Sequence, residues 1–177
     1  IETNYIRAVQ GGVGFVKAAG NYGRSLYPTK LAQQKGYQQV IWVDSAEHKY
    51  FEESGTMNVM FVIGDTLITP ALSDTILDGV TRSSVLALAR DWGMMVEERK
   101  VSITEVFDAI AAGNLKEIFG VGTAATIAQI VGIGFNGTDY ELPPVSDRKF
   151  SPRVDETLRS IRKGKVEDKF GWMMKVV

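Results

Sequence analysis

The stretch Asn58-Val59-Met60-Phe61-Val62-Ile63-Gly64-Asp65-Thr66-Leu67-Ile68-Thr69 is the part of the sequence that decides the fold. Two segments rich in apolar and β-branched residues flank Gly64-Asp65. A glycine beside a small polar residue is typical of a two-residue turn between antiparallel strands. The stretch therefore predicts a β-hairpin with strands at 58–63 and 66–69.

The segments before this hairpin predict one helix and two more strands. A helix is expected over about 24–34, ended by Gly36, because a glycine readily adopts the left-handed conformation that closes a helix. The apolar run 39–43 predicts a buried strand, and 50–53 predicts a short second strand.

The segments after the hairpin continue this alternation of helices and strands. A helix after Thr81 ends at Gly93 and has one apolar face, formed by Val85, Leu88, Ala89 and Trp92. The other expected elements are a strand near 94–101, a helix from the capping box Ser102-Ile103-Thr104-Glu105 to Gly113, a strand at 117–119, a hairpin turn at Asn136-Gly137, a helix with Ser151 at its N-cap and Pro152 at N1, and a strand at 172–177. The pattern predicts one domain of mixed α/β (α+β) class over 1–177.

The composition excludes several classes of protein. The net charge is −1, so no basic excess indicates a nucleic-acid or anionic-membrane partner. The sequence has no cysteine, which excludes disulfides and thiolate metal sites and favours a reducing compartment. We expect no membrane helix, no secretory signal and no metal site. Because the first residue is Ile1, we expect the chain to begin partway through a longer protein.

The run Gly11-Gly12-Val13-Gly14-Phe15-Val16-Lys17-Ala18-Ala19-Gly20-Asn21-Tyr22-Gly23 contains the first candidate site, because Lys17 is its only charge. If its small and apolar neighbours desolvate this lysine, its pKa falls and it becomes the neutral amine that Schiff-base chemistry needs. Composition alone favours the other interpretation, an exposed lysine on a flexible loop.

The run Glu52-Glu53-Ser54-Gly55-Thr56-Met57-Asn58 contains the second candidate. Adjacent residues of a strand point to opposite faces, so we expect only one carboxylate to point inward. An inward carboxylate could hold a proton on a pyridine nitrogen. A solvated strand end is the alternative, and it is favoured when this run is taken alone.

Two further segments could bind an anion. Leu77-Asp78-Gly79-Val80-Thr81 leads into the N-terminus of the expected helix, where free N–H groups favour phosphate. Gly120-Val121-Gly122-Thr123-Ala124-Ala125 follows a strand, and its glycines let backbone approach a ligand closely. Each pattern is common and weak by itself.

Taken in order, these segments resemble the branched-chain aminotransferases, which are fold type IV enzymes of pyridoxal 5′-phosphate. The resemblance covers essentially the whole chain and favours Lys17 as the cofactor lysine over the exposed-loop interpretation. The matching segments are Tyr5–Gly14 with Lys17 and Gly20–Gly23, Glu53–Asn58, Gly79–Arg82, and Gly122–Ala124.

The resemblance implies a role for each candidate residue. Lys17 is the catalytic residue, which binds the cofactor covalently and moves a proton. Glu53 pairs with the pyridine nitrogen, and Tyr22 hydrogen-bonds the phenolic oxygen of the ring. The remaining implied positions are Leu77 on the ring face, Thr56 near the ring, Gly79, Val80, Thr81, Gly122 and Thr123 at the phosphate, and Thr123 with Ala124 at the substrate carboxylate.

The resemblance also implies an architecture and a reaction. The chain would be the large C-terminal domain, a pseudo-barrel of mixed strands surrounded by helices, without the family's small N-terminal domain. That missing domain supplies an arginine for the phosphate and much of the side-chain pocket. Asp78 stands where many members have proline, so the turn before Gly79 is expected to be more flexible.

The expected activity is transfer of the amino group of leucine, isoleucine or valine to 2-oxoglutarate by a cytoplasmic homodimer. A D-amino acid transaminase, an aminodeoxychorismate lyase and a non-catalytic fragment remain alternatives.

Overall fold

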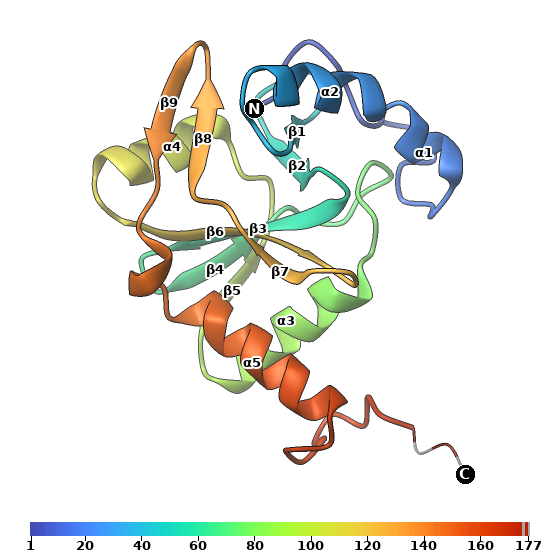
Figure 1. The fold of residues 1–177 in the computed structure, drawn as a ribbon, viewed down its shortest axis with the longest axis vertical. Helices are drawn as coiled ribbons and strands as arrows, with labels where there is room; N and C mark the ends of the chain where they lie inside the picture. Colours follow the sequence, from blue (N-terminus) through green and yellow to red (C-terminus); the bar gives the residue numbers. More distant parts are fainter. Residues whose placement is uncertain (175, 177) are drawn as a thin grey trace.

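The computed structural model describes residues 1–174 and 176. Its elements are α1 (Ala19–Gly23), α2 (Leu26–Gln34), β1 (Ile41–Val43), β2 (Phe51–Ser54), β3 (Met57–Ile63), β4 (Thr66–Thr69), α3 (Val80–Asp91), β5 (Met95–Glu98), α4 (Ile103–Ala111), β6 (Leu115–Gly122), β7 (Thr126–Gln129), β8 (Gly132–Phe135), β9 (Thr138–Glu141), a 3₁₀ turn η1 (Val145–Asp147) and α5 (Phe150–Arg162). The predicted mixed α/β class is confirmed (Figure 1).

Strand β3 is the centre of a seven-stranded sheet. One edge of β3 pairs with β6, and the other pairs first with β2 and then with β4, in each case antiparallel. Strands β4 and β5 are parallel, because helix α3 returns the chain to the same end of the sheet. The sheet is therefore mixed, and within the described residues β1, β5 and β7 each pair with a single strand of it. Strands β8 and β9 form a separate hairpin.

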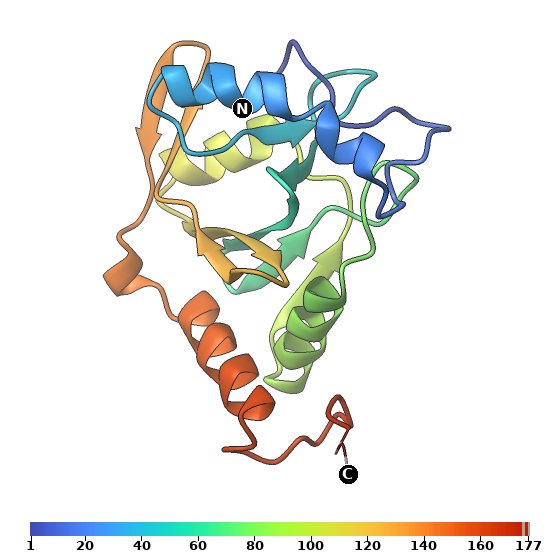
Figure 2. The ribbon, with the colours of Figure 1, turned by 45° about the vertical axis from the view of Figure 1, so that its right-hand side comes forward.

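The sheet is covered on both faces, as Figures 1 and 2 show. Val59 and Phe61 of β3 point into a core shared with α4 and the β8–β9 hairpin. Met60 and Val62 point into a second core, shared with α3 and α5. Alternate residues of a strand face opposite sides, and both sides are apolar here, which explains why β3 is an uninterrupted apolar run.

Most elements lie where the sequence predicts them. The β3–β4 hairpin turns at Gly64, which has φ +57°. Helix α3 ends before Gly93 with φ +75°, and the β8–β9 hairpin turns at Asn136-Gly137, both with positive φ. The side chain of Ser102 accepts a hydrogen bond from the Glu105 N–H group, which confirms the predicted N-cap of α4.

Several boundaries differ from the structure. Helix α2 begins at Leu26 rather than at 24, after the short helix α1, and β6 is longer than the predicted 117–119 strand. Trp172, Met173 and Met174 form no strand, and residues 175 and 177 of the predicted final strand lie outside the described residues.

The N-cap of α5 is Lys149, so the prediction of Ser151 at that position is wrong. The carboxylate of Glu117 on β6 accepts hydrogen bonds from the backbone N–H groups of Lys149, Phe150 and Ser151, at 2.7–2.9 Å. A distant side chain therefore satisfies the helix N-terminus, a task that the sequence pattern assigned to a local hydroxyl.

In the part of the chain that the structure describes, no helix is long and apolar enough to cross a membrane.

Candidate active site

One end of the sheet brings the candidate segments together. Glu53 of β2 pairs with Asn58 of β3, Asn58 pairs with Val121 of β6, and Val121 pairs with Ile127 of β7. Neighbouring strands are about 4.8 Å apart. The β2–β3 turn and the β6–β7 turn therefore lie at the same end of the sheet, a few strand spacings apart.

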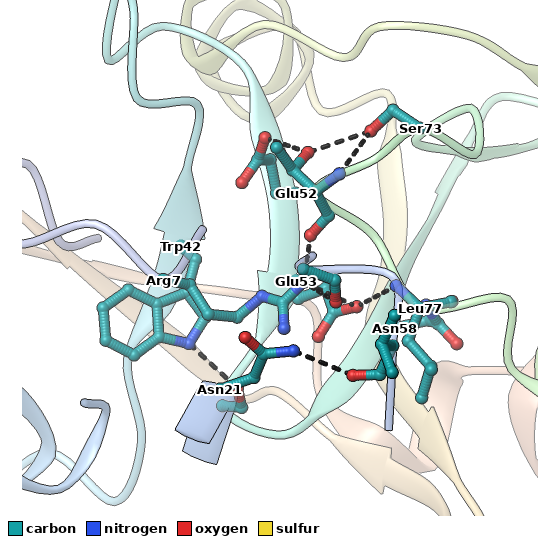
Figure 3. A network of polar contacts seen from close by, with 12 residues as sticks. Arg7, Asn21, Trp42, Glu52, Glu53, Asn58, Ser73 and Leu77 are labelled. Atoms are coloured by element: carbon teal, nitrogen blue, oxygen red, sulfur yellow. Dashed lines mark hydrogen bonds and ion pairs between the residues drawn. The ribbon is translucent and has the colours of Figure 1, made fainter. Parts of the chain in front are cut away.

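Glu53 is a buried carboxylate with one engaged oxygen. Its Oε1 accepts a hydrogen bond from the Leu77 N–H group at 2.8 Å and lies 3.3 Å from Nη2 of Arg7 (Figure 3). No described residue hydrogen-bonds its second oxygen, Oε2. Burial raises the pKa of Glu53 to about 7, although Arg7 and the Leu77 N–H group oppose the increase. A cation placed at Oε2 would favour the ionised form.

Arg7 connects Glu53 to the lysine segment and to the loop before α3. Its guanidinium is buried and donates to the carbonyl oxygens of Gly14 and Thr75, in addition to its ion pair with Glu53. Gly14 is packed so closely that an added Cβ atom would lie 2.5 Å from Cβ of Ala8 and 2.9 Å from Cα of Thr75. Only glycine fits this crossing of the two segments.

Lys17 follows this crossing and is exposed, so the expectation that its small neighbours desolvate it is wrong for this chain. The apolar residues beside it are exposed too: Val13 is 60% and Phe15 50% accessible. Its Nζ lies 5.1 Å from the ring centre of Tyr22, and its charge acts on Glu53. The structure therefore brings Lys17, Tyr22 and Glu53 to one site.

Asn21 fixes the loop that presents Lys17. It is buried in α1, and its Nδ2 donates to the carbonyl oxygens of Val13 and Val16, both at 2.8 Å. These two bonds close the loop just before the lysine. Glycine and asparagine residues predict a turn here, but they do not predict this contact.

Both carboxylates of β2 are buried, so the expectation that only one points inward is wrong. Glu52 is 6% and Glu53 3% exposed. They point to opposite faces as a strand requires, but the 73–77 loop covers Glu52, whose Oε1 accepts a hydrogen bond from Oγ1 of Thr75 at 2.6 Å. Burial raises the pKa of Glu52, and the Thr75 hydroxyl opposes the increase.

Leu77 and Gly79 are held against the sheet by Asn58. The side-chain amide of Asn58 donates to the Leu77 carbonyl oxygen at 2.8 Å. An added Cβ atom at Gly79 would collide with Oδ1 of Asn58. Leu77 is half-buried beside Glu53, and Gly79 is the N-cap of α3.

The two anion-binding candidates line one cavity of about 590 Å³. Thr81 at the start of α3 and Thr123 of the β6–β7 turn are both part of its lining. Its other polar lining residues are Asp78, Ser83, Ser84, Thr126 and Arg162. Arg162 donates to Oγ1 of Thr126 at 2.9 Å, which brings one cation to this cavity.

The remaining predicted residues occupy turns at the same end of the sheet. Thr56 is exposed in the β2–β3 turn, next to Gly55 with φ +57°. Val80 is 81% exposed at the first position of α3. Ala124 is exposed in the β6–β7 turn, and Gly122 packs against Met57. Arg7, Asn21 and Asn58 are functional residues that the sequence did not predict, although each is a polar residue within one of the matching segments.

The fold, with a lysine loop, a buried carboxylate and two candidate anion-binding turns at one end of a mixed sheet, is that of a class IV aminotransferase domain. The family model described as "Amino-transferase class IV" matches residues 16–133, and the chain belongs to this family.

Individual relatives agree with this assignment. The chain is 45% identical over 176 residues to the branched-chain-amino-acid transaminase 1 of Bacillus subtilis, covering 99% of this chain and 49% of that protein. It thus spans about half the length of the curated relatives it matches.

Solved structures show the same fold. The branched-chain aminotransferase of Thermoproteus uzoniensis with norvaline has a TM-score of 0.78 and 28% identity, over 97% of this chain and 53% of that one. The holo, PLP-form enzyme of Thermobaculum terrenum has a TM-score of 0.75 and 27% identity, over 92% and 50%.

Proposed function

We propose that this chain is the cofactor-binding domain of a branched-chain amino acid aminotransferase, with Lys17 holding pyridoxal 5′-phosphate. The complete protein would transfer the amino group of leucine, isoleucine or valine to 2-oxoglutarate. The observation that carries the proposal is the buried Glu53, whose Oε2 has no partner among the described residues and which lies near Lys17. The names of the relatives support the choice of substrates.

The donor groups of the site fit pyridoxal 5′-phosphate. A primary amine at Lys17 suits the aldehyde, and Oε2 of Glu53 suits a protonated ring nitrogen. Thr81, Thr123 and the free N–H groups at the start of α3 suit the phosphate, because a helix N-terminus attracts anions. The hydroxyl of Tyr22 suits the phenolic oxygen, and Leu77 offers an apolar contact for the ring.

The family resemblance gives each residue a task in this proposal. When bound, pyridoxal 5′-phosphate supplies an electron sink that stabilises negative charge at the substrate Cα. Glu53 would keep a proton on the ring nitrogen, because its Oε2 has no partner among the described residues and a cation there favours the ionised carboxylate. Lys17 moves a proton between the substrate Cα and the cofactor C4′. Thr123 and Ala124 present the β6–β7 turn to the substrate carboxylate.

The surface around Lys17 supports the proposal that a second domain completes the site. Val13, Phe15 and Val16, beside Lys17 in the sequence, are exposed, and so are Leu26 and Tyr27 at the start of α2, at 72% and 59%. Exposed apolar groups of this extent usually face another part of a protein. The phosphate arginine, the pocket wall, the homodimer and the cytoplasmic location belong to the same proposal and rest on the family resemblance.

The test is a transamination assay on the complete protein that contains this chain. We expect glutamate formation from leucine and 2-oxoglutarate and no turnover of D-alanine. Turnover of D-alanine without leucine activity would instead identify a D-amino acid transaminase, and pyruvate release from aminodeoxychorismate would identify a lyase.

A further inference from the structure

The loop from Ser73 to Gly79 is joined to β2 and β3 by side chains rather than by strand pairing. Oγ1 of Thr75 donates to Glu52, and the Leu77 N–H group donates to Glu53. The Leu77 carbonyl oxygen accepts from Asn58. Figure 3 shows Glu52, Glu53 and Asn58 of the two strands together with Ser73 and Leu77 of the loop. Two successive carboxylates of one strand therefore hold the same loop at two positions.

A buried glutamate at position 52 lowers the stability of the fold more than an apolar residue would. Its side chain is buried, Oε1 is bonded to Thr75, and Oε2 has no hydrogen-bond partner among the described residues. A buried oxygen without a partner lowers stability, so such a group calls for an explanation. An apolar residue would fill the space without this cost, but it could not hold the Thr75 hydroxyl.

Thr75 links this contact to the proposed ring-nitrogen carboxylate. Its hydroxyl reaches Glu52, while its carbonyl oxygen accepts from the guanidinium of Arg7. The same Nη2 atom of Arg7 lies 3.3 Å from Oε1 of Glu53. Glu52, Thr75, Arg7 and Glu53 thus form one continuous chain of contacts, and Leu77 lies two residues beyond Thr75.

We propose that Glu52 is a positioning residue: through Thr75 it fixes both Leu77 and Arg7 relative to Glu53. The role of Leu77 against a cofactor ring rests on the proposed function, but the placement of the loop does not. Loss of the Glu52–Thr75 bond would release the loop while the Glu53 side chain remained present. Leu77 would then be held less firmly against the cofactor ring. The Glu53 carboxylate would also be less firmly oriented.

The experiment compares two pairs of variants. Glu52→Leu and Thr75→Val remove the hydrogen bond and keep similar volume, whereas Glu52→Gln and Thr75→Ser keep an acceptor or a hydroxyl. Hydrogen exchange at the Leu77 amide is measured in the complete protein without cofactor. We expect about tenfold faster exchange in Glu52→Leu and Thr75→Val, no further increase in the double variant, and near wild-type exchange in Glu52→Gln and Thr75→Ser.

A second readout connects the loop to the ligand. After addition of pyridoxal 5′-phosphate, the induced circular dichroism of the bound chromophore should fall in the two disruptive variants and be kept in the two conservative ones. Unchanged exchange at Leu77 in Glu52→Leu and Thr75→Val would overturn the inference, whatever the ligand does. A wild-type protein that binds no pyridoxal 5′-phosphate would instead refute the proposed function, and the exchange data would still decide the role of Glu52.

Discussion

At the scale of single residues, Glu53 is the group whose environment most restricts what the site can do. It is buried, its Oε1 is engaged by Leu77 and Arg7, and its pKa is raised to about 7. Such a carboxyl group ionises readily when a cation binds at Oε2. When it stays protonated, it lowers the stability of the fold only slightly.

Replacing Glu53 by glutamine should remove most of the activity of the complete protein. We expect a loss on the order of 10²-fold in kcat, because an amide cannot hold the ring nitrogen protonated. The visible absorbance of bound cofactor should remain, since Lys17 and the phosphate contacts are intact. Glu52→Gln is the matched control and should be mild. If Glu52→Gln is the crippling change and Glu53→Gln is nearly silent, our register is wrong by one residue.

The raised pKa of Glu53 also predicts how stability depends on pH. Between 4.5 and about 7 the folded state keeps a proton that the unfolded chain has released. The free energy of unfolding should therefore fall as pH rises through this window and level off above it. The decrease due to Glu53 is about 3 kcal/mol, at about 1.4 kcal/mol per pH unit.

Urea denaturation of the ligand-free protein from pH 4.5 to 8 measures this decrease. The Glu53→Gln variant lacks the titrating group, so its curve should fall less than that of the wild type. Parallel curves for the two proteins would show that burial does not perturb this carboxyl.

The family resemblance predicts Lys17, Tyr22 and Glu53 as cofactor residues, and the structure places Nζ of Lys17 5.1 Å from the ring centre of Tyr22, with its charge acting on Glu53. The resemblance could not show the partners of these residues. Arg7 reaches Glu53 across 46 positions of the chain, and Glu52 is buried only because the 73–77 loop folds over it. Contacts of this kind depend on tertiary packing, which local patterns do not contain.

At the scale of elements, the attachment of α5 depends on one side chain from β6. Glu117 accepts three hydrogen bonds from the first backbone N–H groups of this helix. Its negative charge also lies at the positive end of the helix dipole. Arg148, just before the helix, adds hydrogen bonds to the carbonyl oxygens of Ile118, Ile130 and Pro143.

Glu117→Gln should therefore lower the free energy of unfolding by about 2 kcal/mol, since the amide offers one acceptor oxygen and no charge. Ser151→Ala is the control, because the sequence pattern predicts Ser151 as the cap. Among the described residues, the Ser151 hydroxyl has one hydrogen bond, which it accepts from Gln129, so its loss should cost about 1 kcal/mol or less. If Ser151→Ala lowered the free energy of unfolding more than Glu117→Gln in urea denaturation, Ser151 would be the cap, as the sequence pattern predicts.

Helices and strands could be predicted where the residues that determine their ends are close together in the sequence. The β3–β4 and β8–β9 hairpins were predicted correctly, because turn residues with positive φ and flanking apolar runs are local properties. The start of α5 was not, because its cap comes from 32 residues earlier in the chain.

At the scale of the whole molecule, the chain has two cores of its own on either side of the sheet. The proposed site, in contrast, opens outward. Lys17 is exposed, and so are its apolar sequence neighbours Val13, Phe15 and Val16. The chain also spans about half the length of its curated relatives. A folded domain with an incomplete active site is consistent with these three observations.

Residues 1–177 alone should therefore be a poor aminotransferase. With Lys17 open to water, substrate positioning and electrostatic control are both weakened, and we expect at least a hundredfold less activity than in the complete protein. The measurement is leucine-dependent glutamate formation by residues 1–177 alone and by the complete protein that contains them. Full activity of the segment alone would show that our account of the site is incomplete.

Covalent labelling tests directly whether Lys17 is the residue that holds pyridoxal 5′-phosphate. The complete protein is incubated with pyridoxal 5′-phosphate, reduced with borohydride, digested and mapped by mass spectrometry. The account predicts one pyridoxyl adduct, on Lys17, and none in the Lys17→Ala variant. An adduct on Lys30 or Lys35, or an unmodified Lys17 in protein that has bound the cofactor, would contradict it.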